Sequence, residues 1–175
     1  IINDILDLSK IEAGKMSVEN AEEFPLRQAL EGSLAICGPL AEKFGGQIDS
    51  RLPPETVRLT AVERMIRQIM INLVGNAIKF TPAGTVWLRF RGRPPVETGS
   101  TCQLLVEVSD TGVGIPAARL DHIFDPFVQA KANRDAELKG TGLGLAIVKR
   151  LTTLMGGSIA VRSETWVETW MTFSR

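Results

Sequence analysis

One long amphipathic segment, residues 61–80, constrains the fold of this chain more than any other part of its sequence. Thr60 and Glu63 have the form of a capping box just before and within it. Its apolar residues recur at the spacing of one helix face: Met65, Ile66, Ile69, Leu73 and Ile78. The pattern predicts a helix from about Ala61 to Phe80 that packs one side against a core.

The same helix carries polar side chains toward its C-terminal end. Asn72 and Asn76 are one turn apart and project from the same side. Their neutral oxygens can hold a Mg²⁺ ion that also takes phosphate oxygens, while Lys79 can reach a phosphate and Phe80 can pack beside a base. An asparagine pair alone is more often a solvated face or a local cap, so this segment predicts a nucleotide site only together with downstream motifs.

Length, composition and charge limit the class of protein. The chain has 175 residues, 44% of them hydrophobic, which is enough for one core with a small appendage. The formal net charge is zero, so the whole-chain charge favours neither nucleic acid nor membrane. No apolar run reaches the roughly 20 residues that span a bilayer. We expect Cys37 and Cys102 to be reduced thiols of a cytoplasmic protein.

Helix and strand patterns alternate along the rest of the chain. Residues 1–11 have the pattern of the end of an amphipathic helix, whose apolar stripe needs a partner upstream, in a second subunit or on the domain itself. Because the chain starts within this pattern, we expect it to be a piece of a longer protein. Further helices are predicted from Pro25 to Gly45 and from Gly144 to Gly156. Strands are predicted at 19–24, near 48, at 57–59, at 86–90 and at 103–109, the last two as antiparallel neighbours.

A carboxylate and two glycines follow the strand at 103–109, in the order Asp110-Thr-Gly112-Val-Gly114-Ile115. At a strand end, the carboxylate can accept a hydrogen bond from a purine amine, and the glycines let the backbone approach a ligand. This motif is also a common turn, so alone it leaves both interpretations open.

Two more motifs lie further along the chain. Phe124 and Phe127 stand in a turn-prone segment, and the polar run 129–139 has the composition of a mobile lid. Residues 140–145, Gly-Thr-Gly-Leu-Gly-Leu, then open an apolar helix. Glycines at such a point present free backbone N–H groups and the positive end of the helix dipole, which suit phosphates.

In this order, the four motifs resemble the N box, first glycine box, F box and second glycine box of sensor histidine kinases. Residues 1–16 resemble the end of the dimerisation and phosphotransfer helix of hybrid kinases, and residues 17–175 resemble the catalytic ATP-binding domain. The resemblance implies an α/β two-layer sandwich, with a mixed sheet of about five strands covered on one face by three helices. Strands near 157–162 and 167–173 would complete the sheet.

The resemblance also implies roles for individual residues. Asn72 and Asn76 would coordinate Mg²⁺, and Asn72 and Lys79 would serve the phosphoryl transfer. The ATP-binding residues would be, in chain order, Asn76, Phe80, Asp110, Gly112, Gly114, Ile115, Phe124, Phe127, Gly140, Thr141, Gly142, Leu143 and Gly144. Of these, Asp110 would read the adenine amino group, and the two phenylalanines would anchor the lid.

The phosphate acceptor of such kinases is a histidine on a hairpin that would lie upstream of Ile1. The only histidine here, His122, lacks the sequence context of that acceptor, and we expect no acceptor role for it. The implied partners are the hairpin of a homodimer and a response-regulator receiver domain, without nucleic acid. A membrane would be reached only through parts outside the chain, as in an anchored sensor.

Two other functions remain as alternatives. The first is an ATPase of the chaperone, topoisomerase or mismatch-repair type, in which a glutamate one turn before the metal-binding asparagine activates water; Asn72 stands at that position and cannot act as that base. The second is a divergent regulatory module with weak or no nucleotide binding. Lys139, at a position where many relatives have glycine, and the unusual closing hairpin fit that alternative. Trp166 and Trp170 in this hairpin predict an exposed partner surface, unless a one-residue register slip buries them.

Overall fold

A computed structural model of the chain describes residues 2–93, 103–128, 140–163 and 169–174. The helices are α1 (Ile2–Glu12), α2 (Leu26–Lys43), α3 (Glu63–Phe80), α4 (Ala117–Leu120) and α5 (Gly144–Leu154). The strands are β1 (Glu22–Pro25), β2 (Gln47–Arg51), β3 (Arg58–Ala61), β4 (Thr85–Arg93), β5 (Gln103–Asp110), β6 (Ser158–Ser163) and β7 (Thr169–Ser174).

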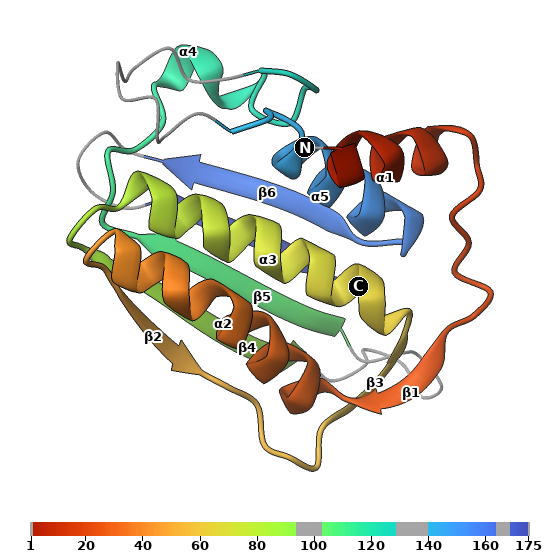
Figure 1. Cartoon of the computed structure of the whole chain (residues 1–175). Coiled ribbons are helices and arrows are strands. Elements are labelled where there is room, and N and C mark those ends of the chain that lie inside the picture. The colour runs from red at the N-terminus through yellow and green to blue at the C-terminus, as the bar shows by residue number, and fades with distance from the viewer. Residues whose placement is uncertain (1, 94–102, 129–139, 164–168, 175) are drawn as a thin grey trace.

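The structure is a two-layer α/β sandwich, as predicted. Five strands form a mixed sheet in the order β2-β4-β5-β7-β6, in which only the β2–β4 pair is parallel. Helices α2, α3 and α5 cover one face of this sheet, with α3 in the middle (Figure 1). The predicted antiparallel pair of strands is confirmed, since Leu88 of β4 lies opposite Val108 of β5. Strands were predicted at the places of β1 and β3, but neither their pairing into a two-stranded sheet nor the short α4 was predicted.

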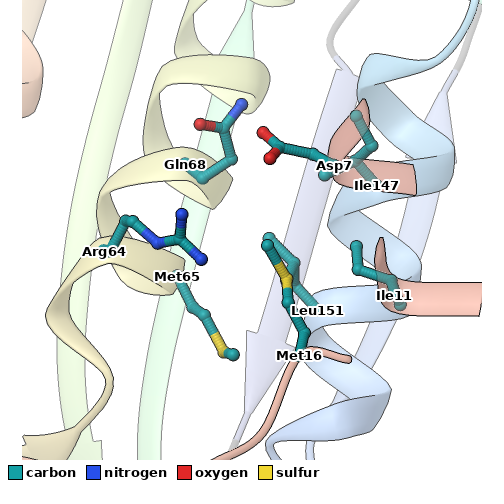
Figure 2. Close-up of a pocket in the computed structure, with 8 residues that line it drawn as sticks. All are labelled: Asp7, Ile11, Met16, Arg64, Met65, Gln68, Ile147 and Leu151. Atoms are coloured by element: carbon teal, nitrogen blue, oxygen red, sulfur yellow. The ribbon is translucent and has the colours of Figure 1, made fainter. Parts of the chain in front are cut away.

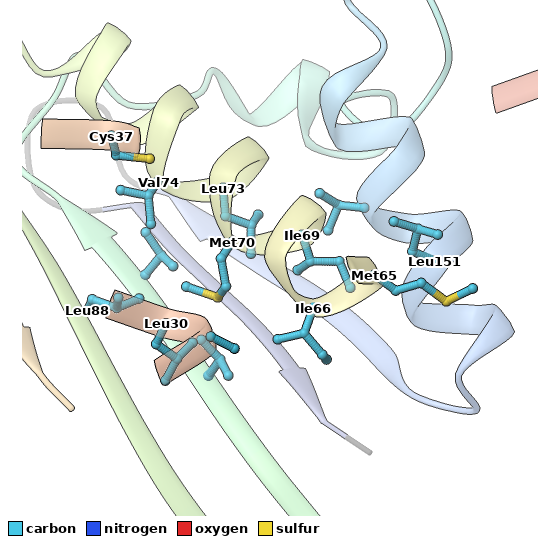
Figure 3. Close-up of a cluster of buried hydrophobic side chains, with 14 of the residues drawn as sticks. Leu30, Cys37, Met65, Ile66, Ile69, Met70, Leu73, Val74, Leu88 and Leu151 are labelled. Atoms are coloured by element: carbon cyan, nitrogen blue, oxygen red, sulfur yellow. The ribbon is translucent and has the colours of Figure 1, made fainter. Parts of the chain in front are cut away.

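The core lies between α3 and the sheet. All five residues of the predicted apolar stripe are buried, and Met70, Val74 and Ala77 join them. Figure 3 shows this stripe between the side chains of Leu30 from α2 and Leu151 from α5. Eight buried side chains on one 18-residue helix leave only its opposite side for polar groups. The hydrophobic stripe therefore determines which way the asparagines of α3 point.

The predicted start of α3 and its capping box were wrong. Ala61 ends β3, where it pairs with Glu22 of β1, and the helix begins two residues later at Glu63. The N-cap residue is Val62, which has extended backbone angles and makes no side-chain cap hydrogen bond. Thr60 lies within β3 and pairs with Glu23. Ala61, which the helical pattern assigned to the helix, is thus part of a strand, because it pairs with β1.

The N-terminal helix α1 is only partly accounted for by contacts within the chain. Leu8 is buried in the core, whereas Ile2, Ile5 and Leu6 are exposed. Gly14, with φ of +64°, lies in the turn that follows the helix, as predicted. The sequence predicted that the apolar stripe needs a partner. For Leu8 this partner is the core of the domain, whereas no contact within the domain covers Ile2, Ile5 and Leu6 among the described residues.

The two ends of the domain differ in how far they match the predictions. The predicted strand at 19–24 forms only from Glu22, because a turn from Val18 to Ala21 precedes it. The closing strand β7 pairs Met171 with Val108 and Phe173 with Val106, and both valines are buried. The exposure of the Trp166 and Trp170 side chains, like the environment of Cys102, falls outside the part that the structure describes.

Candidate functional site

The C-terminal half of α3 and the start of α5 meet at the two asparagines. A Cβ atom added to Gly144, the first residue of α5, would lie 3.4 Å from Oδ1 of Asn72 and 3.6 Å from Nδ2 of Asn76. Both asparagines are partly buried. Asn72 Nδ2 is fully buried and has no hydrogen-bond partner among the described residues. Such an orphaned amide is rare in folded proteins and indicates a place for another polar group.

Lys79 and Phe80 form the next part of the same wall. The ammonium of Lys79 lies 5.2 Å from the centroid of the Phe80 ring, within the range of a cation–π contact. A Cβ atom at Gly140 would come within 2.9 Å of Lys79 Nζ, so the glycine leaves room for this cation. Burial lowers the pKa of Lys79 from its ordinary value, because the charged form loses water. An anion at this point would compensate for the lost hydration.

Asp110 anchors a compact hydrogen-bond cluster at the end of β5. Its side chain is buried, with 7% exposure, and its Oδ1 accepts hydrogen bonds from the Thr81 hydroxyl at 3.1 Å and the Gly112 N–H at 2.9 Å. A Cβ atom at Gly112 would lie 2.4 Å from the Phe80 carbonyl oxygen. Only glycine therefore allows the loop to close over the end of α3. The carboxylate is held in one orientation at the floor of the site.

The rest of the first glycine motif runs from this cluster toward α4. Gly114 has φ of +67°, a conformation that glycine adopts without strain. The N–H of Ile115 donates a hydrogen bond of 2.7 Å to the hydroxyl of Ser163 at the end of β6. This bond ties the loop to the far edge of the sheet.

The F box joins the second glycine box through backbone contacts. The Phe127 N–H donates a hydrogen bond of 3.0 Å to the Gly142 carbonyl, and both residues have positive φ. A Cβ atom at Gly142 would lie 2.9 Å from the Phe127 carbonyl carbon. Phe127 is 68% exposed, whereas Phe124 is partly buried and the centroid of its ring lies 5.6 Å from Lys149 Nζ of α5. The predicted lid, residues 129–139, lies outside the described residues.

The second glycine box ends at a helix N-terminus with the properties that anions need. Leu143 is the N-cap of α5, and its N–H donates to the Thr141 hydroxyl at 3.2 Å. The first turn of α5 contains no acidic residue. The N–H groups at the start of a helix lack partners within it, and the helix dipole adds positive potential there. This loop, residues 140–143, therefore offers N–H groups and positive potential that suit an anion, and we call it the phosphate loop.

The structure thus brings all four motifs together around the ends of α3 and α5. Three residues that the sequence did not single out also contribute: Thr81, Ser163 and Asp4, whose carboxylate accepts a hydrogen bond from Thr141. Thr81 follows directly after Phe80, so its position next to the first motif was a usable signal. Ser163 and Asp4 carry no such signal, because their roles depend on distant segments. His122 is exposed, and its Nδ1 lies 2.9 Å from Oδ2 of Asp125.

The asparagine pair fits a hydrated Mg²⁺ ion. Mg²⁺ prefers oxygen ligands, keeps several water molecules and is usually shared with substrate phosphates. Asn72 and Asn76 lie beside Gly144 at the end of the phosphate loop, and their Oδ1 atoms are the oxygen ligands that such an ion would take. The buried Nδ2 of Asn72 is a hydrogen-bond donor without a partner among the described residues, so it suits a phosphate oxygen and not the metal. No helix within the described ranges has the length and apolar character needed to cross a membrane.

Known proteins are similar to this chain in both sequence and fold. LuxQ of Vibrio vulnificus, an autoinducer 2 sensor kinase/phosphatase, is 39% identical over 166 residues, covering 94% of this chain and 19% of LuxQ. The sensor protein GacS of Pseudomonas syringae is 42% identical over 164 residues, covering 93% of this chain and 18% of GacS. The chain therefore spans about a fifth of the length of these curated relatives.

The crystal structure of full-length ShkA in complex with AMPPNP matches the fold with a TM-score of 0.78 and 30% sequence identity. The match covers 99% of this chain and 34% of the ShkA chain. A sequence model of the histidine kinase-, DNA gyrase B- and HSP90-like ATPases matches residues 61–175. With a site assembled from the four motifs and relatives that are sensor kinases, the chain belongs to this ATPase family, as an ATP-binding catalytic domain of the sensor histidine kinase type.

Proposed function

We propose that this domain binds ATP together with Mg²⁺ between the end of α3 and the phosphate loop and transfers the γ-phosphate to a histidine on a hairpin domain outside residues 1–175. The observation that carries the proposal is the position of Gly144 beside Asn72 and Asn76, since a Cβ atom added to this glycine would contact both side chains. It supports a common site for the metal-binding amides and the helix N-terminus that suits phosphates. We further propose that residues 1–16 belong to that hairpin and residues 17–175 to the catalytic domain.

Each part of the site has a task in this proposal. Asp110 accepts a hydrogen bond from the adenine amino group, because its carboxylate is already oriented by Thr81 and Gly112. Gly112, Gly114 and Ile115 line the base pocket, and Phe80 packs against the ring. Such an arrangement favours adenine over guanine, which presents a carbonyl oxygen in place of the amine.

The phosphates occupy the other half of the site. Gly140, Thr141, Gly142, Leu143 and Gly144 hold them with backbone N–H groups, and Lys79 supplies a cation from α3. Asn72 and Asn76 would hold Mg²⁺, which would supply positive charge to neutralise the phosphates. Phosphoryl transfer of this kind depends mainly on positioning and charge, so the chain needs no nucleophile of its own. Phe124 and Phe127 anchor the segment that leads into residues 129–139.

The proposed partners follow from the same function. The hairpin supplies the acceptor histidine and the homodimer contact, and a response-regulator receiver domain takes the phosphate onward. The relatedness to LuxQ and GacS supports this assignment. We also propose a cytoplasmic location, since the proposed substrate is ATP.

Titration with Mg-AMPPNP tests the nucleotide site directly. Asp110→Asn should weaken binding about ten-fold or more, because a hydrogen bond to a charged group contributes about 1.5–3 kcal/mol. Asp49→Asn is the matched control, since Asp49 is an exposed carboxylate on β2. Equal affinities for the parent and Asp110→Asn would refute the assignment of the adenine pocket.

Transfer requires a second experiment with a supplied hairpin domain. The 175-residue chain with Mg-ATP should label that hairpin on its histidine and should not label itself. Stable, acid-labile phosphate on the chain alone that disappears in His122→Ala would contradict the proposal. Nucleotide binding without any transfer to a hairpin would instead favour a regulatory module.

A further inference from the structure

A hydrogen-bonded chain connects α1 to the start of α5. The Thr141 hydroxyl donates to Oδ2 of Asp4 at 3.3 Å and accepts from the Leu143 N–H at 3.2 Å. Asp4 and Thr141 are 137 residues apart in sequence, so only the docking of α1 brings them together. The carboxylate of α1 therefore lies at the phosphate loop itself.

The Thr141 hydroxyl can serve only one acceptor at a time. A hydroxyl group carries a single proton, and here it is given to Asp4. A phosphate oxygen bound in this loop would compete for the same proton. Asp4 and the phosphates are also both negative, and charges in a partly buried site interact more strongly than charges in water. Competition for the Thr141 proton and charge repulsion therefore both disfavour a state in which α1 is docked and phosphates are bound at the same time.

The attachment of α1 is weak enough to respond to such opposition. Leu8 is the one buried side chain among the described residues of α1, Ile11 packs against the core while partly exposed, and the ion pair between Glu12 and Arg150 is exposed and 3.9 Å long. A cavity of about 20 Å³ remains between α1, α3 and α5. In Figure 2, Asp7 points across this cavity toward Gln68, on the same wall as Arg64. The interface is therefore incompletely packed.

We propose that Asp4 and Thr141 form a nucleotide-sensitive latch: docked α1 lowers the affinity of the phosphate loop for ATP, and bound ATP releases α1 from α5. The inference rests on the proposed nucleotide function. Such coupling is reciprocal. The factor by which docked α1 lowers the affinity for ATP therefore equals the factor by which bound ATP lowers the equilibrium constant for docking of α1. If residues 1–16 belong to the hairpin, the latch reports occupancy of the ATP site to the helix that leads to the acceptor histidine.

The test compares nucleotide affinities of the full 175-residue chain and Asp4→Asn by calorimetric titration. Asp4→Asn should bind Mg-AMPPNP about five-fold more tightly than the parent does. Its gain in affinity should be smaller for ADP, and its affinity for adenosine should equal that of the parent. The gain should shrink at high salt, because it arises from charge. Leu8→Ala, which removes the apolar anchor and no charge, should give a similar gain, and the double variant should gain no more than the better single variant.

Asp7→Asn is the control, because Asp7 lies one turn along α1 and faces the cavity. Its affinity for AMPPNP should stay within two-fold of the parent. Suppose that the parent binds AMPPNP and that Asp4→Asn binds it no more tightly. That result would overturn the latch and leave the proposed function standing, and so would a gain in adenosine affinity equal to the gain in AMPPNP affinity. Failure of the parent to bind any adenine nucleotide would overturn the proposed function and the latch with it.

Discussion

Replacing Gly112 with alanine should disrupt the hydrogen-bond cluster around Asp110. The added Cβ would lie 2.4 Å from the Phe80 carbonyl oxygen and 2.6 Å from both Asp110 Oδ1 and Thr81 Oγ1. Ordinary contacts of this kind are longer by about 1 Å, and protein interiors are packed too densely to absorb such a shift freely. Two of the three atoms belong to the cluster, and the third is backbone at the end of α3. The loop must therefore move away from α3 or the carboxylate must turn.

The expected cost follows from two overlapping effects. Overpacking of a dense interior costs about 1–3 kcal/mol, and weakening the hydrogen bonds of a buried polar group costs about 1–3 kcal/mol. We expect Gly112→Ala to lower the free energy of unfolding by about 2–4 kcal/mol, which shifts the melting temperature by roughly 4–16 °C for a domain of this size. Because Asp110 is displaced, affinity for Mg-ADP should fall at least about ten-fold, or 1.4 kcal/mol.

Urea unfolding, thermal melting and Mg-ADP titration measure these effects. Gly38→Ala is the matched control, because a Cβ at Gly38, inside α2, meets no atom within 4 Å. The free energy of unfolding of that variant should stay within about 1 kcal/mol of the parent, because the helix preference of alanine is offset by its crowding against the ring of the following Pro39. The reasoning would be refuted if Gly112→Ala kept the parent's nucleotide affinity and its free energy of unfolding within about 0.5 kcal/mol.

Three further predictions concern the charge, the buried thiol and turnover. Burial lowers the pKa of Lys79 from its ordinary value of 10.5, so the unfolded chain binds the proton more tightly than the folded one. The free energy of unfolding of the parent, relative to Lys79→Met, should therefore rise as the pH approaches 10.5 from below. Urea titrations check this, and a falling difference would contradict it; Lys79→Met should also bind Mg-AMPPNP more weakly. Burial raises the pKa of the Cys37 thiol to about 11, so in a Cys102→Ser background Cys37 should resist iodoacetamide at pH 8 until the protein unfolds; mass spectrometry showing rapid native alkylation would oppose this. Steady ATP hydrolysis should stay far below one turnover per second, because Asn72 replaces a general base, and turnover near that rate in a clean phosphate-release assay would favour an ATPase.

The local patterns of the sequence predicted the elements that build the site. The stripe on α3 repeats with the period of a helix, so it identified both the buried face and, by exclusion, the side on which Asn72 and Asn76 lie. The alternation in β4 identified its buried face in the same way, with Val86 and Leu88 both inside. These features depend on residues a few positions apart, which is why a single sequence reveals them. The order of the four motifs further indicated the protein family. That family in turn predicted that the four motifs form a single site.

Contacts between distant segments were decided only in the tertiary structure. Ala61 has a helical pattern around it, yet it pairs with Glu22 in a strand, because the ladder with β1 satisfies its backbone. Thr81 orients Asp110 from 29 residues away, and Asp4 reaches Thr141 across 137 residues. No local periodicity encodes such pairs, since each depends on how α1, α3, α5 and β5 pack. The sequence therefore determined which residue types the site contains, and packing determined which neighbours hold them in place.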